Sequence, residues 1–186
     1  MKYATFWQRL AAMWIDGLIL VPLYFIHELL RPFSREVAII LVVPMTTLYC
    51  AYTIYCHGRY GQTIGKHAMG IRVVRTTGER IGWRESWLRG SIDVVFSILT
   101  AVSSFIALAA IADSQYYGVG WLQRTQSLQA LEPTWLAWTA TANLIWTLSE
   151  VVVMFFNTRR RALHDFIGGT VVISEQRISE ALTQAT

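Results

Sequence analysis

Four long apolar stretches dominate the pattern of hydrophobic and polar positions along the chain. They run from Phe6 to Leu30, from Val37 to Cys56, from Trp87 or Leu88 to Ala112, and from Thr134 to Phe156. An α-helix needs about 20 apolar residues to cross the roughly 30 Å of hydrocarbon in a bilayer. Each stretch is long enough to do so, and the pattern therefore predicts an all-α membrane protein built as a four-helix transmembrane bundle.

Positive charge is distributed unevenly among the polar segments that separate these stretches. The segment between the second and third stretch is rich in arginine, and Arg159–Arg161 follow the fourth. Residues 113–133 contain one basic residue, Arg124. The short turn between the first and second stretches contains Arg31 and Arg35, a mild exception to the separation of basic and non-basic segments. Because cytoplasmic loops of membrane proteins are enriched in Lys and Arg, we expect the central loop and both termini to lie in the cytoplasm.

Two short polar-flanked segments have the composition of β-strands. Ile71–Arg75 and Thr170–Ser174 are rich in β-branched residues, and Thr76–Glu79 is typical of a turn. Since an isolated short strand is unstable in water, we expect the two segments to pair in a small cytoplasmic β element. No linker or repeat divides the chain, so we expect one transmembrane domain over residues 1–175 and a short cytoplasmic tail over residues 176–186.

The composition agrees with a protein surrounded by a lipid bilayer. Hydrophobic residues make up 54% of the chain and charged residues 15%, whereas a soluble domain carries about 25% charged residues. The formal net charge of +4 is consistent with arginine-rich cytoplasmic loops. A run such as Arg159–Arg161 beside a membrane helix fixes topology far more often than it binds nucleic acid, so we expect no nucleic-acid partner.

Ionisable residues within the apolar stretches are the most informative about function. Arg9 and Asp16 lie in the first stretch, Arg89 and Asp93 in the third, and Glu150 near the end of the fourth. A charged side chain at mid-bilayer costs at least about 2.5–3.5 kcal/mol, so such groups persist where they pair, face a wet cavity or carry function. The expected topology places all five in the inner half of the bilayer, where we expect one inward-facing polar cluster.

Within this cluster, a direct ion pair between Asp16 and Arg89 is the best single expectation. Arg9 precedes Asp16 by two helical turns, about 10 Å along the axis, and should instead reach back toward the inner headgroups. Two interpretations stay open on equal terms. The cluster is either a binding or proton-coupling site, in which a buried acid alternates between proton and cation, or a clamp of neutralising charges between helices.

Other motifs give weaker indications. Gly61–His67 resembles a phosphate-binding loop but has one residue too few between its glycines, and neither Ser nor Thr follows Lys66. We expect a tight turn there, with Lys66 near anionic headgroups. No histidine has a partner at metal-ligand spacing and no catalytic arrangement is visible, so we expect no metal, no cofactor and no enzyme activity. His164 and Asp165 could form an acid–base pair, although a capping role for Asp165 is equally open.

Four motifs in order resemble the RDD family of bacterial integral membrane proteins. They are Phe6–Ala12 leading to Asp16, Gly61–Lys66 with Gly70–Val74, Arg89-x-x-x-Asp93, and Arg161–Asp165. The likeness runs from Tyr3 to about Ile173. The family-motif positions that it carries over are Gly61, Thr63, Gly65, Lys66, His164 and Asp165.

The family is named for one arginine and two aspartates. Arg9 and Asp16 match the first two of these residues, and the second aspartate is either Asp93 or Asp165. The resemblance implies a multi-pass protein of the bacterial cytoplasmic (inner) membrane that transports unknown ligands. Some relatives are similar to sodium/proton antiporters.

Two hypotheses of function follow. In the first, the protein is a small ion or solute transporter that works as a homo-oligomer or with a membrane partner protein, because four helices enclose little space. Asp16 would be the coupling acid, Asp93 and Glu150 supporting acids, and Arg9 and Arg89 counter-charges. In the second, the protein is a non-transporting membrane adaptor or assembly subunit that docks a partner on its cytoplasmic face.

Overall fold

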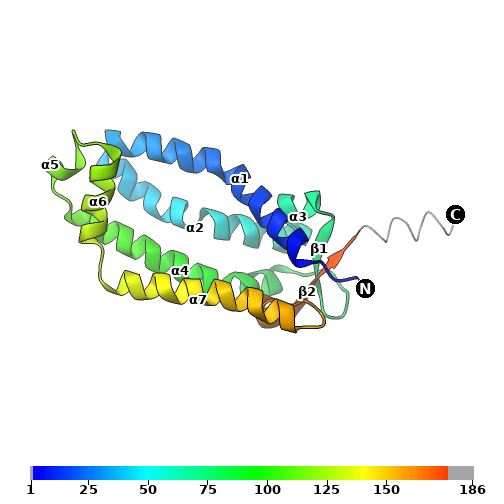
Figure 1. Cartoon of the computed structure of the whole chain (residues 1–186). Helices are drawn as coiled ribbons and strands as arrows, with labels where there is room; N and C mark the ends of the chain where they lie inside the picture. Colours follow the sequence, from blue (N-terminus) through cyan, green and yellow to red (C-terminus); the bar gives the residue numbers. More distant parts are fainter. Residues whose placement is uncertain (1, 176–186) are drawn as a thin grey trace. The chain divides into compact units, whose positions relative to one another are not determined.

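The structure, a computed structural model, describes residues 2–175 (Figure 1). The expected tail, residues 176–186, lies outside these described residues. Within them, four helical spans are long and apolar enough to cross a membrane: Phe6–Phe33, Arg35–Tyr60, Trp83–Ala110 and Trp135–Phe156. The prediction of four membrane-length helices is therefore confirmed.

The long helices agree closely with the apolar stretches. They are α1 (Phe6–Leu30), α2 (Arg35–Tyr60), α4 (Trp83–Ala110) and α7 (Trp135–Phe156). Two of them extend beyond the predicted bounds, α2 through His57 and Arg59 and α4 back to Trp83. Hydropathy misses such ends because polar residues can continue a helix once it leaves the hydrocarbon. Pro22 and Pro44 lie inside α1 and α2, as membrane helices permit.

The chain divides into two compact units, each assembled from separated stretches of sequence. Among the described residues, unit 1 comprises residues 2–19, 50–91 and 145–175, and unit 2 comprises residues 20–49 and 92–144. Each of the four long helices contributes one part to each unit. Four of the five residues of the expected polar cluster belong to unit 1, and Asp93 belongs to unit 2.

Unit 2 is built around an apolar core between α2 and α4. A short 3-10 helix, η1 (Arg31–Phe33), precedes α2, and two helices, α5 (Asp113–Tyr116) and α6 (Trp121–Leu131), follow α4. Tyr116 is buried in the core and its hydroxyl donates to the Arg31 carbonyl over 2.7 Å, while the Arg124 guanidinium lies 5.6 Å from the Tyr116 ring centre. Residues 113–133, which the hydropathy pattern marks only as a polar segment between two apolar stretches, thus contain α5 and α6.

Unit 1 contains the two-stranded sheet that the sequence predicted. The strands β1 (Ile71–Arg75) and β2 (Thr170–Ser174) are antiparallel, with Val73 opposite Val172. The segment before α1 runs along β2, where Ala4 donates its N–H to the Val172 carbonyl over 2.9 Å (Figure 1). Two one-turn helices, α3 (Ile64–Ala68) and α8 (Leu163–Ile167), lead into β1 and β2 respectively. The strand pairing is confirmed with the predicted bounds of both strands.

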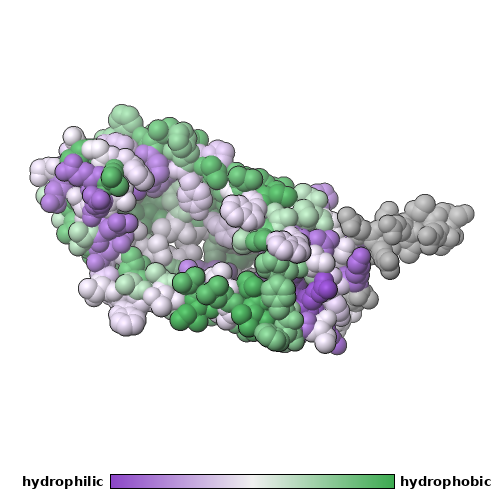
Figure 2. Space-filling model, in the orientation of Figure 1, coloured by the Kyte–Doolittle hydropathy of each residue, from purple (hydrophilic) through white to green (hydrophobic). Residues whose placement is uncertain are grey.

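The outer faces of the long helices are apolar. Figure 2 shows hydrophobic side chains along α1 and α7, and hydrophilic side chains over α5 and α6. In α1, Trp14 and Leu18 are each 65% exposed, and in α7 Phe156 is 88% exposed. Such surfaces are unfavourable in water but are what a helix needs where it contacts lipid.

Candidate functional site

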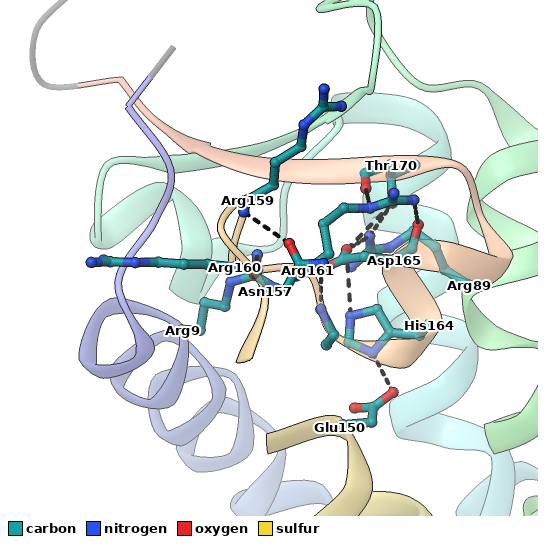
Figure 3. A network of polar contacts seen from close by, with 11 residues as sticks. Arg9, Arg89, Glu150, Asn157, Arg159, Arg160, Arg161, His164, Asp165 and Thr170 are labelled. Carbon is teal, nitrogen blue, oxygen red and sulfur yellow. Dashed lines mark hydrogen bonds and ion pairs between the residues drawn. The ribbon is translucent and has the colours of Figure 1, made fainter. Parts of the chain in front are cut away.

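Asp165 lies at the centre of a buried ion cluster in unit 1 (Figure 3). Its side chain is fully buried, and those of Arg9 and Arg89 are only 12% and 5% exposed. Arg9 donates from Nη1 to Asp165 Oδ2 over 2.7 Å, and Arg89 Nη1 pairs with Oδ1 of the same carboxylate. One carboxylate thus joins α1, α4 and α8.

The local sequence of α8 places Asp165 for this role. Asp165 stands in the first turn of α8, and its Oδ2 accepts the Ala162 N–H over 3.0 Å, which satisfies one of the free donors at the helix N-terminus. A capping role and a charge-pairing role therefore coexist on one side chain. Gly168 gives Arg89 room to reach it, because a Cβ at Gly168 would lie 2.5 Å from Arg89 Cγ.

Opposing influences act on the ionisation of Asp165. Burial raises the pKa of the Asp165 carboxyl, but the surrounding positive charges, with Arg89 first, outweigh burial and hold the pKa well below its usual range. Thr170 adds its hydroxyl to the contacts of both Arg89 and Asp165. Asp165 is therefore an ionised carboxylate that stabilises two buried guanidinium groups.

Arg161 connects the backbone segments that flank this carboxylate. Its Nη2 donates to the Asp165 backbone carbonyl over 2.9 Å and its Nε to the Thr170 carbonyl over 3.0 Å. Its guanidinium also lies 4.0 Å from the ring centre of Phe166, within the range of a cation–π contact. Arg161 thus ties α8 to the start of β2 (Figure 3).

Asp16 forms a second buried polar centre, with a side chain from α1. The residue is 1% exposed. Its Oδ1 accepts the Tyr52 hydroxyl and the Gly65 N–H, each over 2.7 Å, and its Oδ2 accepts the Thr63 hydroxyl over 2.6 Å. Asp16 therefore connects α1 to α2 and to the beginning of α3.

The expected ion pair between Asp16 and Arg89 is not formed, and that expectation is wrong. Donors from α2 and from Thr63–Gly65 fill both oxygens of Asp16, while Arg89 pairs with Asp165. The expected orientation of Arg9 toward headgroups is also corrected. Arg9 binds Asp165 and donates to the Arg160 carbonyl over 2.7 Å, because the turn after α7 and the helix α8 supply acceptors within its reach.

The glycine-rich segment before β1 fits against the backbone of α1. A Cβ at Gly65 would lie 2.1 Å from the Ala12 carbonyl oxygen, so only glycine allows this approach. Thr63 caps α3, since its Oγ1 accepts the Lys66 N–H over 3.3 Å, and Gly61 has a positive φ of 75°. These family-motif positions therefore shape the segment that binds Asp16.

Lys66 follows this segment and lies within the electrostatic reach of both polar centres. Burial lowers the pKa of the Lys66 ammonium to about 8, and the positive charge of Arg89 acts in the same direction. The negative charges of Asp16 and Asp165 oppose this shift. Lys66 therefore loses its proton at about pH 8, below the usual range of a lysine.

A third acid, Glu150, is paired with a histidine. Glu150 Oε1 lies 2.5 Å from His164 Nδ1, and the two side chains are 21% and 24% exposed. The other ring nitrogen, Nε2, lies 3.7 Å from Asp165 Oδ1. The histidine thus stands between two carboxylates, one on α7 and one on its own helix α8 (Figure 3).

Unit 1 therefore brings together Arg9, Asp16, Arg89 and Glu150 with the family-motif residues His164 and Asp165. Sequence reasoning missed Tyr52 and Thr170, because neither carries a charge and nothing in an apolar helix or a β-strand distinguishes them. Within residues 2–175, no group of three or more His, Cys, Asp or Glu is arranged to hold a metal ion.

The match to a known family covers every charged residue of this site. The model of the RDD family matches residues 3–169. The chain belongs to the RDD family. No curated protein matches it in sequence. In this RDD protein the arginine at position 9 binds Asp165 directly, and the matched residues include both Asp93 and Asp165.

Proposed function

We propose that this membrane protein transports a small ion or solute, and that it does so by cation/proton exchange through the polar centres of unit 1. The observation that carries the proposal is the pairing of one fully buried carboxylate, Asp165, with Arg9 and Arg89 from two membrane-length helices. Charges at such positions are expensive and are concentrated at ion and proton pathways.

Energetics favour a functional role for these charges over a role that only holds the helices together. Replacing a buried ion pair by apolar residues of similar volume is often neutral or stabilising by about 1–4 kcal/mol. A chain that needed only adhesion between helices could therefore use small or apolar residues there. The charges of Arg9, Arg89 and Asp165 are instead suited to a site where the balance of charge changes during a cycle.

The roles within the site follow from the contacts. Asp16, expected to be the coupling acid, accepts three hydrogen bonds, and we assign it the positioning of the Thr63–Lys66 segment. Arg9 and Arg89 keep the role of counter-charges. Glu150 keeps the role of an acid near the cluster. For Asp93 we keep the proposed role of a supporting acid.

The arginine-rich segments of unit 1 suggest its placement in the cell. By the positive-inside rule, the central loop and both termini face the cytoplasm of a bacterium, and the polar centres lie in the inner half of the cytoplasmic membrane. Four helices enclose little space, so we propose that the working form is a homo-oligomer or a complex with a membrane partner.

Reconstituted vesicles test this proposal. Purified protein in liposomes that contain a pH-sensitive dye is exposed to inward gradients of sodium, potassium or lithium. We expect cation-driven proton release from the lumen with native protein and with Gly17→Ala, a control substitution in α1 with no atom within 4 Å of the new Cβ. We expect no release with folded Asp165→Asn. Equal flux from native protein and Asp165→Asn would show that the cluster is not involved.

A membrane adaptor is the second candidate. It is favoured by one observation: the carboxylates of Asp16 and Asp165 already have protein partners, as a purely structural clamp requires. The sheet would then be the docking surface, since Arg72 and Arg75 on β1 are 33% and 42% exposed. A stoichiometric partner that co-purifies with native protein and is lost on Arg72→Glu would support this candidate.

A further inference from the structure

The His164 ring is held between two acids that differ in their surroundings. Its Nδ1 lies 2.5 Å from Glu150 Oε1, and its Nε2 lies 3.7 Å from Asp165 Oδ1 (Figure 3). A ring nitrogen and a carboxylate oxygen both carry lone pairs, so the contact with Glu150 requires a proton between them. When only that proton is present, the lone pair of Nε2 faces the ionised Asp165.

A second proton relieves this repulsion. In the imidazolium form both nitrogens are donors, so that Nδ1–H faces Glu150 and Nε2–H faces Asp165. The arrangement therefore suits two protonation states that differ by one proton. In one, the pair of Glu150 and His164 carries no net charge, and in the other it carries a single negative charge on Glu150.

The other two acids of unit 1 are poorly suited to exchanging protons. Protonation of Asp16 or Asp165 would disrupt three or more contacts to each carboxylate, and both side chains are sealed from solvent. Glu150 and His164 keep 21% and 24% of their side-chain surface exposed. They are therefore less enclosed by protein than Asp16 and Asp165 are.

We propose that Glu150 and His164 together form the proton-exchanging site of this protein, and that Asp165 is the positioning residue that holds the imidazole ring. The inference deepens the proposed function, since it names the groups that take up and release the proton in cation/proton exchange. In each cycle one proton leaves the ring for water, the pair changes from neutral to negative, and no electron is transferred.

Charged groups from every neighbouring element act on this site. Asp165 belongs to α8 itself, and it is neutralised by Arg9 from α1 and Arg89 from α4. From α2, His57 lies close enough to His164 for their charges to interact. The arginines keep Asp165 ionised, so one fixed negative charge always faces Nε2, and Glu150 supplies the second.

Nitrogen NMR of the whole protein tests the proposal without any transport. The protein is labelled with ¹⁵N-histidine in lipid nanodiscs and titrated with acid, and its four histidines are assigned by single substitutions to Gln. In Glu150→Gln we expect the protonation midpoint of His164 to fall by about one pH unit, because an opposite charge is lost. The matched control is His67→Gln, which removes an exposed histidine of α3 that contacts Gln62 and should leave His164 unchanged.

Two outcomes would overturn the inference. The first is a His164 midpoint that is the same in native protein and Glu150→Gln. The second applies if Glu150→Gln does not fold: Glu150→Ala, which also removes the carboxylate, would then be measured, and an unchanged His164 midpoint in it would equally reject the pair.

Vesicle flux separates this inference from the proposed function. If His164→Gln keeps native exchange with its native pH profile, the protein exchanges ions but the proton site is elsewhere. If native protein shows no flux while Glu150→Gln shifts the His164 midpoint, the proton site stands and the proposed function fails. Loss of exchange in His164→Gln, with the NMR shift in Glu150→Gln, supports both.

Discussion

Replacing Gly65 by alanine should damage the protein far more than its size suggests. The new Cβ would lie 2.1 Å from the Ala12 carbonyl oxygen and 2.9 Å from Asp16 Cγ. Both distances are well below van der Waals contact, and the first involves backbone of the long helix α1, which cannot move locally. The start of α3 must therefore separate from α1.

The cost of this separation has two parts. Overpacking in a dense interior costs about 1–3 kcal/mol. Displacing α3 also breaks the 2.7 Å hydrogen bond from the Gly65 N–H to Asp16, and a hydrogen bond to a charged group contributes about 1.5–3 kcal/mol. We therefore expect Gly65→Ala to lower the free energy of unfolding by about 3–5 kcal/mol.

The assay is reversible unfolding in mixed micelles of mild detergent and SDS, followed by tryptophan fluorescence. Gly17→Ala is the matched control: it adds the same methyl group to α1, one residue from Asp16, with no atom within 4 Å of the new Cβ. Alanine is the better helix former by up to about 1 kcal/mol, so Gly17→Ala should be neutral or stabilising. Equal stability of the two variants would refute the close approach of α3 to α1.

Three further predictions follow from the same site. Asp165→Asn should lower the free energy of unfolding by about 3–5 kcal/mol, because it leaves buried guanidinium groups without a counter-charge; the same micelle assay measures this loss. Tyr52→Phe, which removes one donor to Asp16, should cost about 1.5–3 kcal/mol in that assay, and a change below about 0.5 kcal/mol would contradict the bond. Lys66 should titrate at about pH 8, as seen by NMR of ¹³C-methylated protein in Lys2→Arg background. Since folding lowers this pKa from 10.5 to about 8, stability should rise between these pH values, and Lys66→Met should remove that rise.

The membrane helices and the small sheet could be predicted because each follows from local chemistry. Four apolar stretches of sufficient length leave few alternatives to membrane helices. The two strands were predictable because both segments are rich in β-branched residues. A lone short strand is unstable in water, so the two were expected to pair. The α6 helix was missed because it is neither apolar nor regularly amphipathic, so nothing in Trp121–Leu131 distinguishes it from an irregular segment.

The composition of the candidate site was predicted better than its pairing. Arg9, Asp16, Arg89 and Glu150 could be selected because ionisable groups are rare within membrane helices. The partner of Arg89 could not, because Asp165 lies 76 residues further along the chain and reaches Arg89 only through the turn of α8. Asp16 was assigned to the wrong partner for the same reason: its donors from Thr63 and Gly65 depend on a loop whose path no local pattern specifies.

The proposed exchange of cations for protons is tested most directly by measuring both ions in one vesicle preparation. Native protein is reconstituted in sealed liposomes, and an inward sodium, potassium or lithium gradient is applied while a lumenal dye reports proton release and a cation-selective electrode reports uptake. We predict proton release that is matched by cation uptake for at least one of these ions and is absent from protein-free liposomes. Folded native protein that moves neither protons nor cations under any of these gradients would contradict it.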